Sequence, residues 1–262
     1  MASPELLALD FDGVICDGLI EYFQTAWRAY CLLFNPKSDR PPDGLAEKFY
    51  PLRPIIETGW EMPVLVRSLV ANEPSKKIIE QWPEMALQYL KAAGLEKSQS
   101  AGALDGVRDK WIEEDLQGWL SLHRFYPGLV DRLNKLLVED FPVYIISTKE
   151  GRFIKALLDQ SDVDFPTERI IGKEVKRPKY ETIRLLKEQQ AVSRIWFVED
   201  RLPALNQVEQ QNDLAEVQLF LADWGYNLES DRQSVRRSDR QDSRIRLLSL
   251  EQIVQPFDAW TR

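Results

Sequence analysis

Two aspartates follow a short apolar run near the start of the sequence. In the segment LLALDFDGVICDG, the run Leu6–Leu9 ends at Asp10, and Asp12 follows two positions later. Residues two apart in a strand project to the same face, so the two carboxylates begin side by side. Two like charges about 4 Å apart repel by about 4 kcal/mol at an effective dielectric constant of about 20. A divalent cation offsets this repulsion, and Mg²⁺ prefers carboxylates, water and phosphate oxygens, so the pair predicts a magnesium site.

Two further apolar runs end in polar residues, and Gly13 follows the aspartate pair. Gly13 permits a tight turn that brings the backbone close to a ligand. The run VYII ends at Ser147 and Thr148, and the run IWFV ends at Glu199 and Asp200. In a parallel sheet the ligand lies beyond the carboxyl ends of the strands. We therefore expect these strand ends to gather around one Mg²⁺ ion and one phosphoryl group.

The apolar runs predict a parallel β-sheet that positions these residues. Continuous apolar runs of this length are typical of strands buried on both faces. The segments VQLFL, Ile170–Ile171 and IRLLSLEQIV predict further strands, and apolar residues recur at helical spacing between the runs, for example after Pro127-Gly128. Strands alternating with helices predict an α/β fold with a doubly wound, Rossmann-like parallel sheet.

A long segment after the first strand interrupts this alternation. Its apolar residues recur at helical spacing from Leu19 to Phe34, and five of the eight tryptophans lie in it. Further helices are expected at residues 64–70, 78–90 and 105–120. The predicted organisation is therefore a core of residues 1–15 and 122–262 with an inserted α-helical cap domain of residues 16–121.

Composition and charge exclude several classes of protein. The chain has 34 Lys and Arg residues against 42 Asp and Glu residues, and this net charge of −8 disfavours nucleic acid and anionic membranes as partners. Residues 229–246 alternate Arg, Asp and Ser, which predicts an exposed connection. No apolar run approaches the roughly 20 residues of a membrane-spanning helix, and no cationic stretch precedes an apolar one at the N-terminus, so we expect a cytoplasmic protein.

The cysteines and the single histidine limit the possible chemistry. Cys16 and Cys31 suit neither a zinc site nor a disulfide framework, and we expect buried free thiols. His123 is the only histidine, which excludes multi-histidine metal centres, and we expect it to be structural or solvent-exposed. The motifs GxSxG, GxxxxGK[ST] and GxGxxG do not occur. Catalysis would therefore depend on carboxylates, hydroxyls and lysines.

These motifs together resemble those of the haloacid dehalogenase (HAD) superfamily of phosphatases and phosphotransferases. DFDGVICDG resembles the first motif, and YPGLVDRL, VYIIST, PKYETIRLL and FVEDRLPAL follow in the order and spacing of that family. The resemblance covers the core, whereas the cap matches only in position and helical character. It implies a HAD core with a helical cap inserted after the first motif. The implied activity is magnesium-dependent hydrolysis of a small phosphorylated metabolite.

The resemblance also implies catalytic roles. Asp10 would be the nucleophile and form an aspartyl-phosphate intermediate. Asp12 would protonate the leaving alkoxide and then activate water. Ser147 would hold a phosphoryl oxygen, and Thr148 with the following helix start would supply further donors. Gly13 would bring backbone close to the substrate.

The implied metal ligands are Asp10, Asp200, the backbone carbonyl of Asp12, and Glu199 directly or through water. A lysine should balance the charge of the intermediate, and Lys176 and Lys179 both precede the helix of PKYETIRLL. We favour Lys179 because it enters that helix directly, and we keep Lys176 as a candidate substrate-binding residue.

Two alternative functions remain open at this point. Phosphomutases of the family share the DxDGVI pattern, so an isomerase of sugar phosphates is one alternative. A non-catalytic HAD-like binding protein is the other, because Arg201 follows Asp200 and Ala204 stands where many members carry a further acid. Dehalogenation is disfavoured, since it would leave Asp12 and the magnesium ligands without a role. Neither the substrate nor the oligomeric state follows from the sequence.

Overall fold

The computed structural model describes residues 3–237 and 243–260, and the chain divides into two compact units. The core unit comprises Met1–Asp17 and Arg124–Arg262, and the helical unit comprises Gly18–His123. Both junctions lie two residues later than the boundaries expected from the sequence. Within the described residues, no helix combines the length and apolar character that crossing a membrane requires.

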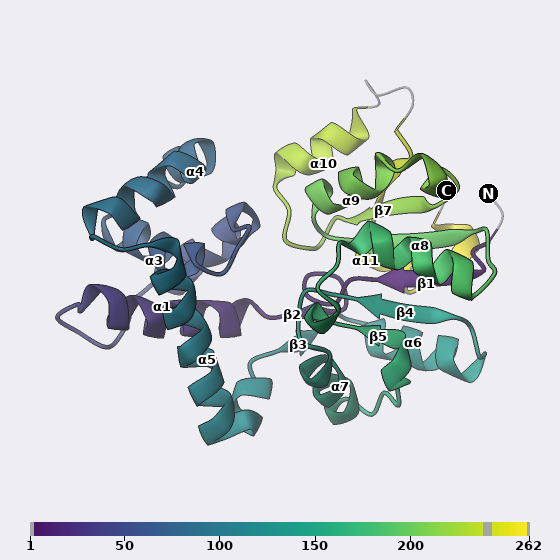
Figure 1. The fold of residues 1–262 in the computed structure, drawn as a ribbon, viewed down its shortest axis with the longest axis horizontal. Helices are drawn as coiled ribbons and strands as arrows, with labels where there is room; N and C mark the ends of the chain where they lie inside the picture. The colour runs from purple at the N-terminus through teal and green to yellow at the C-terminus, as the bar shows by residue number, and fades with distance from the viewer. Residues whose placement is uncertain (1–2, 238–242, 261–262) are drawn as a thin grey trace. The chain divides into compact units, whose positions relative to one another are not determined.

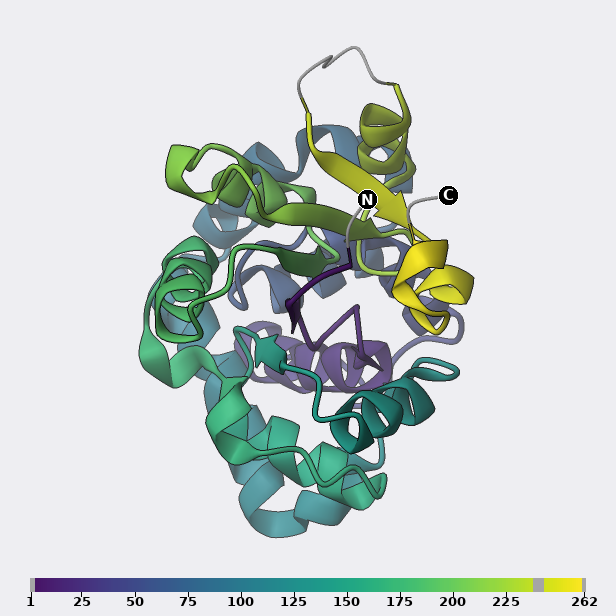
Figure 2. The ribbon, with the colours of Figure 1, turned by 90° about the vertical axis from the view of Figure 1, so that its right-hand side faces the viewer.

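A six-stranded parallel sheet lies at the centre of the core unit (Figure 1). Its spatial order is β5-β4-β1-β6-β7-β8. The strands are β1 (Leu6–Leu9), β4 (Val143–Ile146), β5 (Ile170–Ile171), β6 (Ile195–Glu199), β7 (Gln218–Ala222) and β8 (Ile245–Leu248). Figure 2 shows β8 running beside β7. Each strand coincides with an apolar run in the sequence. The predicted doubly wound α/β fold is therefore confirmed.

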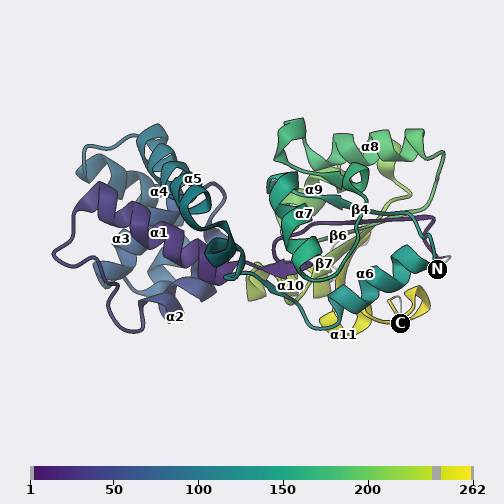
Figure 3. The same cartoon turned by 90° about the horizontal axis from the view of Figure 1, so that it is seen from below.

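Helices cover both faces of this sheet. They are α6 (Leu129–Val138), α7 (Gly151–Gln160), α8 (Lys179–Gln189), α9 (Leu202–Glu209), α10 (Glu229–Arg236) and α11 (Leu250–Ile253). Short 3-10 helices span Thr167–Arg169, Lys173–Val175, Asn212–Leu214 and Phe257–Ala259. Figure 3 shows α8 and α9 on one side of the sheet and α6 and α11 on the other. Two short antiparallel strands, β2 (Cys16–Asp17) and β3 (Arg124–Phe125), complete the unit.

The strands are buried on both faces because alternate side chains enter two separate cores. On one face, Ala8 and Phe197 join a cluster that includes Leu205 of α9. On the other face, Trp196 packs against Phe220 and against Trp260 near the C-terminus, with ring centroids 5.0 and 5.4 Å apart. This double burial fixes the strands rigidly, so the residues at their carboxyl ends are held on a stable edge.

The helical unit contains the four helices expected from the inserted segment, together with a short helix and a 3-10 helix that the sequence did not predict. The expected helices are α1 (Leu19–Phe34), α3 (Glu61–Val70), α4 (Ser75–Ala92) and α5 (Lys97–Leu120), the short helix is α2 (Leu45–Phe49), and the 3-10 helix spans Tyr50–Ile55. The buried carboxylate of Glu21 joins α1 to α5, because it accepts hydrogen bonds from Arg108 Nε at 2.8 Å and Trp119 Nε1 at 3.1 Å. Removing one member of such a network would leave a buried polar group without its partner.

Some expectations about individual segments were wrong or incomplete. The exposed connection expected at residues 229–246 contains the helix α10, and residues 238–242 lie outside the described residues. Both cysteines are free, but only Cys16 is buried, whereas Cys31 is half-buried. His123 is buried with its ring 4.6 Å from that of Trp119, so its role is structural.

Phe220→Ala should destabilise the core unit by about 3–5 kcal/mol, because it removes a fully buried ring from the aromatic core and leaves a cavity. Val138→Ala is the matched control, since Val138 is 88% exposed and its replacement should change stability by less than about 0.5 kcal/mol. Chemical denaturation followed by circular dichroism measures both. Equal stability of the two variants would contradict the described packing.

Candidate functional site

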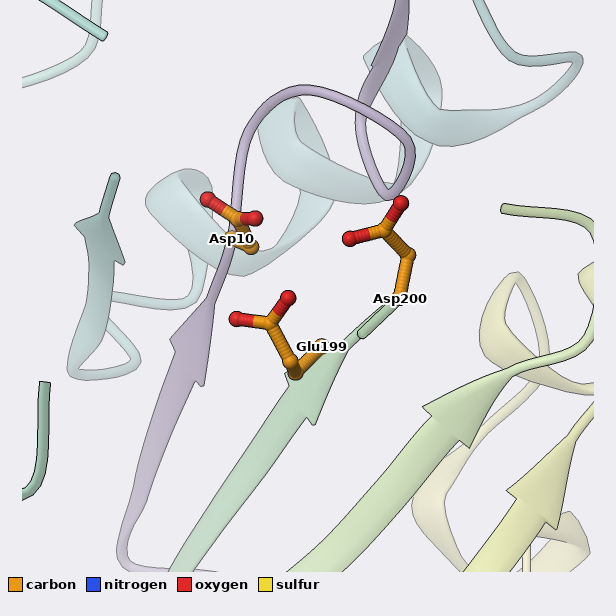
Figure 4. A group of neighbouring side chains, drawn as sticks. All are labelled: Asp10, Glu199 and Asp200. Atoms are coloured by element: carbon orange, nitrogen blue, oxygen red, sulfur yellow. The ribbon is translucent and has the colours of Figure 1, made fainter. Parts of the chain in front are cut away.

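Three carboxylates converge at the carboxyl ends of two neighbouring strands. Asp10 follows β1, Glu199 ends β6, and Asp200 comes next (Figure 4). One ligand atom from each residue lies within 4.8 Å of the others, and all three side chains are buried. The parallel register pairs Leu9 with Val198, and Asp10 N–H donates to the Val198 carbonyl at 2.9 Å. Sheet register therefore brings Asp10 beside Glu199.

A lysine from the start of α8 bridges two of these acids. Lys179 Nζ lies 2.9 Å from Asp10 Oδ1 and 2.6 Å from Glu199 Oε2. The other oxygen of Glu199 accepts a hydrogen bond from Arg201 N–H at 3.0 Å. The two lysines considered from the sequence thus differ in position: Lys179 lies in the acidic cluster, whereas Lys176 is exposed.

Asp200 is held by a loop that follows β7. Its Oδ2 accepts a hydrogen bond from Tyr226 N–H at 2.8 Å, and Asn227 Nδ2 donates to its backbone carbonyl at 2.9 Å. Two glycines make room for it. A Cβ on Gly13, whose φ is +83°, would lie 2.1 Å from Asp200 Oδ2, and one on Gly225 would lie 2.3 Å from Asp200 Cβ. Both positions therefore require glycine.

The carboxylate of Asp12 lies outside this cluster and forms a separate ion pair. Lys149 Nζ is 3.2 Å from Asp12 Oδ1 and 3.4 Å from Asp12 Oδ2. The side chain of Lys149 is only 10% exposed, so the pair is well shielded from water. Coordination of a metal through the backbone carbonyl of Asp12 stays a prediction.

The hydroxyl residues Ser147 and Thr148 follow β4, which lies beside β1 on the side away from β6. Ser147 is buried, its N–H donates to the Ile171 carbonyl at 3.0 Å, and its Oγ accepts from Lys149 N–H at 3.2 Å. Thr148 is exposed. Both residues line a pocket of about 240 Å³ together with Lys179. Lysine and hydroxyl donors thus face the same space, where they could bind an anion.

Lys149, Tyr226 and Asn227 are positioning residues that sequence reasoning did not identify. Lys149 directly follows Ser147-Thr148, and this position next to the motif could have identified it as a site residue. The loop DWGYN, residues 223–227, carries a glycine between aromatic residues just after a strand, which was the available signal for the other two. Tyr226 also donates its hydroxyl to Asp17 Oδ1 at 2.8 Å, which links this loop to β2.

The buried cluster carries more negative than positive charge. Asp10, Glu199 and Asp200 contribute −3 when ionised and Lys179 contributes +1, which leaves −2. Burial, together with the nearby charge of Glu199, raises the pKa of Asp10 to about 7. The same two causes raise the pKa of Asp200. Burial is the largest single influence on Glu199 and opposes its ionisation, but the charge of Lys179 and the hydrogen bonds from Lys179, Asp200 and Arg201 N–H together hold the pKa of Glu199 below its usual value.

This donor set fits a divalent cation. A +2 ion would offset the excess charge, and carboxylate oxygens within 4.8 Å of one another can share one hard metal ion. The raised pKa values of Asp10 and Asp200 report the same imbalance, since ionising both acids without a cation is unfavourable. Asp10 and Asp200 are the stronger candidate ligands, because both carboxylate oxygens of Glu199 are already engaged, one by Lys179 and the other by Arg201 N–H, whereas Lys179 contacts Asp10 through Oδ1.

Gly225→Ala should weaken Mg²⁺ binding by about tenfold or more, because the added Cβ displaces Asp200. Gly102→Ala is the control, since a Cβ there meets nothing within 4 Å. The measurement is the Mg²⁺ concentration that raises the melting temperature half-maximally. An unchanged value for Gly225→Ala would contradict the assigned role of this turn.

In the presence of a chelator, the free energy of unfolding should fall as pH rises from about 4 to about 7. Asp10 releases its proton near its ordinary value of 3.8 when unfolded but near 7 when folded, so the folded state holds more protons in this window. Thermal melts across this range measure the effect. Asp10→Asn should make the fall shallower but not abolish it, because the pKa of Asp200 is also raised, and an equally steep fall in that variant would show that Asp10 does not contribute to it.

No protein-family model and no curated protein matches this chain. Solved structures do match it along nearly its whole length. A protein named as a predicted phosphatase from Clostridium acetobutylicum is 12% identical, with a TM-score of 0.58 and 97% of each chain covered. One named as a haloacid dehalogenase-like hydrolase from Bacteroides fragilis is 15% identical, with a TM-score of 0.59 and coverage of 95% of this chain and 99% of that chain.

A third solved structure, named as a predicted phosphoglycolate phosphatase from Haemophilus somnus, is 14% identical. Its TM-score is 0.54, and the match covers 87% of this chain and 89% of that chain. Similarity at this level of identity concerns the fold. The chain therefore has the fold of the haloacid dehalogenase-like hydrolases, as its motifs predicted.

Proposed function

We propose that this protein is a magnesium-dependent phosphatase that hydrolyses a small phosphorylated metabolite through an aspartyl-phosphate intermediate. One observation carries the proposal: the buried carboxylate of Asp10 contacts Lys179 and belongs to one acidic cluster with Glu199 and Asp200, at the edge of the sheet where ligands bind in such folds. The motif resemblance supports it, as do solved structures of the same fold whose names include phosphatases. The net charge of −8 agrees with a small-molecule ligand rather than nucleic acid.

The proposed cofactor is Mg²⁺, held by Asp10, Asp200 and the backbone carbonyl of Asp12, with Glu199 contributing directly or through water. When bound, it would neutralise negative charge so that a phosphoryl group can approach the carboxylates. The protein's own residues supply the remaining functions. Lys179 would balance charge on the phosphoryl oxygens, and Ser147 and Thr148 would donate hydrogen bonds to them.

The reaction has two steps in this proposal. First, an Asp10 carboxylate oxygen forms a bond to phosphorus, the bond to the ester oxygen breaks, and Asp12, which enters this step protonated, gives that proton to the departing oxygen. Water then forms a bond to phosphorus, Asp12 takes its proton, and the bond to Asp10 breaks, which releases inorganic phosphate. The pairing with Lys149 holds the Asp12 carboxylate apart from the acidic cluster, so the two aspartates can perform different tasks.

Asp10→Asn should lower phosphate release by at least about a thousandfold, because the amide cannot act as the nucleophile. The assay measures inorganic phosphate from a panel of phosphate monoesters, with Mg²⁺ or with chelator. Asp131→Asn, an exposed acid on α6, is the control and should match the unmodified protein. The unmodified protein should also lose activity in chelator.

Other outcomes would replace this proposal. Isomerised sugar phosphate in place of inorganic phosphate would identify a phosphomutase. Tight binding of a metal fluoride that mimics phosphate, with no turnover of any ester, would identify a non-catalytic binding protein. Equal activity of Asp10→Asn and the unmodified protein would exclude Asp10 as the nucleophile.

A further inference from the structure

A cationic pocket adjoins the candidate phosphoryl site within the core unit. Its volume is about 240 Å³, and it lies between the ends of β4 and β5 and the start of α8. Ser147, Thr148 and Lys179 belong to its lining, so the pocket shares these residues with the candidate site. The lining also includes Lys173 and residues 175–178. We call this space the basic pocket.

The charge of the basic pocket is opposite to that of the whole chain. Its lining includes four cations and no acid, although the net charge of the protein is −8. Two of the four cations are paired: Lys179 contacts Asp10 and Glu199, and Lys173 Nζ lies 3.3 Å from Glu150. No ion pair within residues 3–237 and 243–260 involves the other two, Lys176 and Arg177. The pocket therefore retains two uncompensated positive charges.

One buried hydroxyl orients Arg177, and the backbone turns at Lys176 beside it. Lys176 ends the 3-10 helix Lys173–Val175 in the left-handed region, with φ of +48°. Arg177 Nε donates to Thr182 Oγ1 at 3.0 Å, and Thr182 is only 1% exposed. This bond occupies Nε and leaves the two terminal nitrogens of the guanidinium for a ligand. Helix α8 also begins without a side-chain cap, so its first N–H groups are available to an anion.

We propose that the basic pocket binds a second anionic group on the substrate, so that the substrate class is a phosphate monoester that carries another phosphate or a carboxylate. Lys176 and Arg177 are the specificity-determining residues. This inference rests on the proposed phosphatase. Ser147 and Lys179, which would bind the reacting phosphoryl group, also line the basic pocket, so a second anion in the pocket would lie next to that phosphoryl group. A planar guanidinium suits both phosphate and carboxylate, so the shared feature is the extra negative charge.

Matched pairs of substrates test this directly. Glucose 1,6-bisphosphate against glucose 6-phosphate tests a second phosphate, and 2-phosphoglycolate against ethyl phosphate tests a carboxylate. The unmodified protein should prefer the doubly anionic member of at least one pair in kcat/KM, and the pair that shows the preference identifies the anion. Equal kcat/KM within both pairs would overturn the proposal.

The double variant Lys176→Gln/Arg177→Gln should remove this preference. We expect kcat/KM for the doubly anionic ester to fall about tenfold to a hundredfold, and that for its singly anionic partner to change less than about threefold. The control Arg152→Gln/Lys155→Gln removes two charges from α7, outside the pocket, and should leave both values unchanged. Equal losses of kcat/KM for both esters would mean that the two cations affect overall electrostatics or folding, and this would contradict a specific contact with the second anion.

Calorimetric binding of the same esters separates this inference from the proposed reaction. If no ester is hydrolysed, the proposed phosphatase fails, but tighter binding of the doubly anionic ester that is lost in Lys176→Gln/Arg177→Gln would still support the pocket. If esters are hydrolysed but binding shows no such dependence on these two residues, the phosphatase stands and the second-anion pocket is excluded.

Discussion

The central physical constraint in this structure is an excess of buried negative charge at the carboxyl ends of two adjacent strands. Register forces Asp10 beside Glu199, and Asp200 follows directly. Lys179 compensates one charge of three. Burial of unpaired carboxylates is costly, and their pKa values rise in response. In the proposed function, a divalent cation removes this cost, so that a phosphoryl group can approach the carboxylates.

The rest of the site is built to maintain that arrangement. Gly13 and Gly225 leave the space that Asp200 occupies, and the Tyr226 N–H fixes its carboxylate. Lys149 keeps the second aspartate of the motif separate from the cluster. Each of these contacts joins segments far apart in the sequence, so the geometry depends on the complete core unit. The basic pocket shares Lys179 with the acidic cluster and gathers three further cations near the start of α8.

The sequence predicted the sheet because strands buried on both faces are continuous apolar runs, and it predicted the acids because they directly follow those runs. It did not predict α10, whose side chains are almost entirely polar and which is stabilised by ion pairs of Glu229 with Arg232 and Arg236. Lys149 was missed because a lysine after a strand is ordinary until the neighbouring turn is known. Tyr226 was missed because it holds Asp200 through a backbone N–H, which any residue except proline provides.

The most direct test of this account is a crystal structure with Mn²⁺ in place of Mg²⁺, analysed by anomalous scattering. The account predicts one strong anomalous peak within about 2.5 Å of carboxylate oxygens from both Asp10 and Asp200. The absence of such a peak at the acidic cluster at saturating Mn²⁺, with Lys179 as the only cation in contact with the carboxylates, would contradict the central claim.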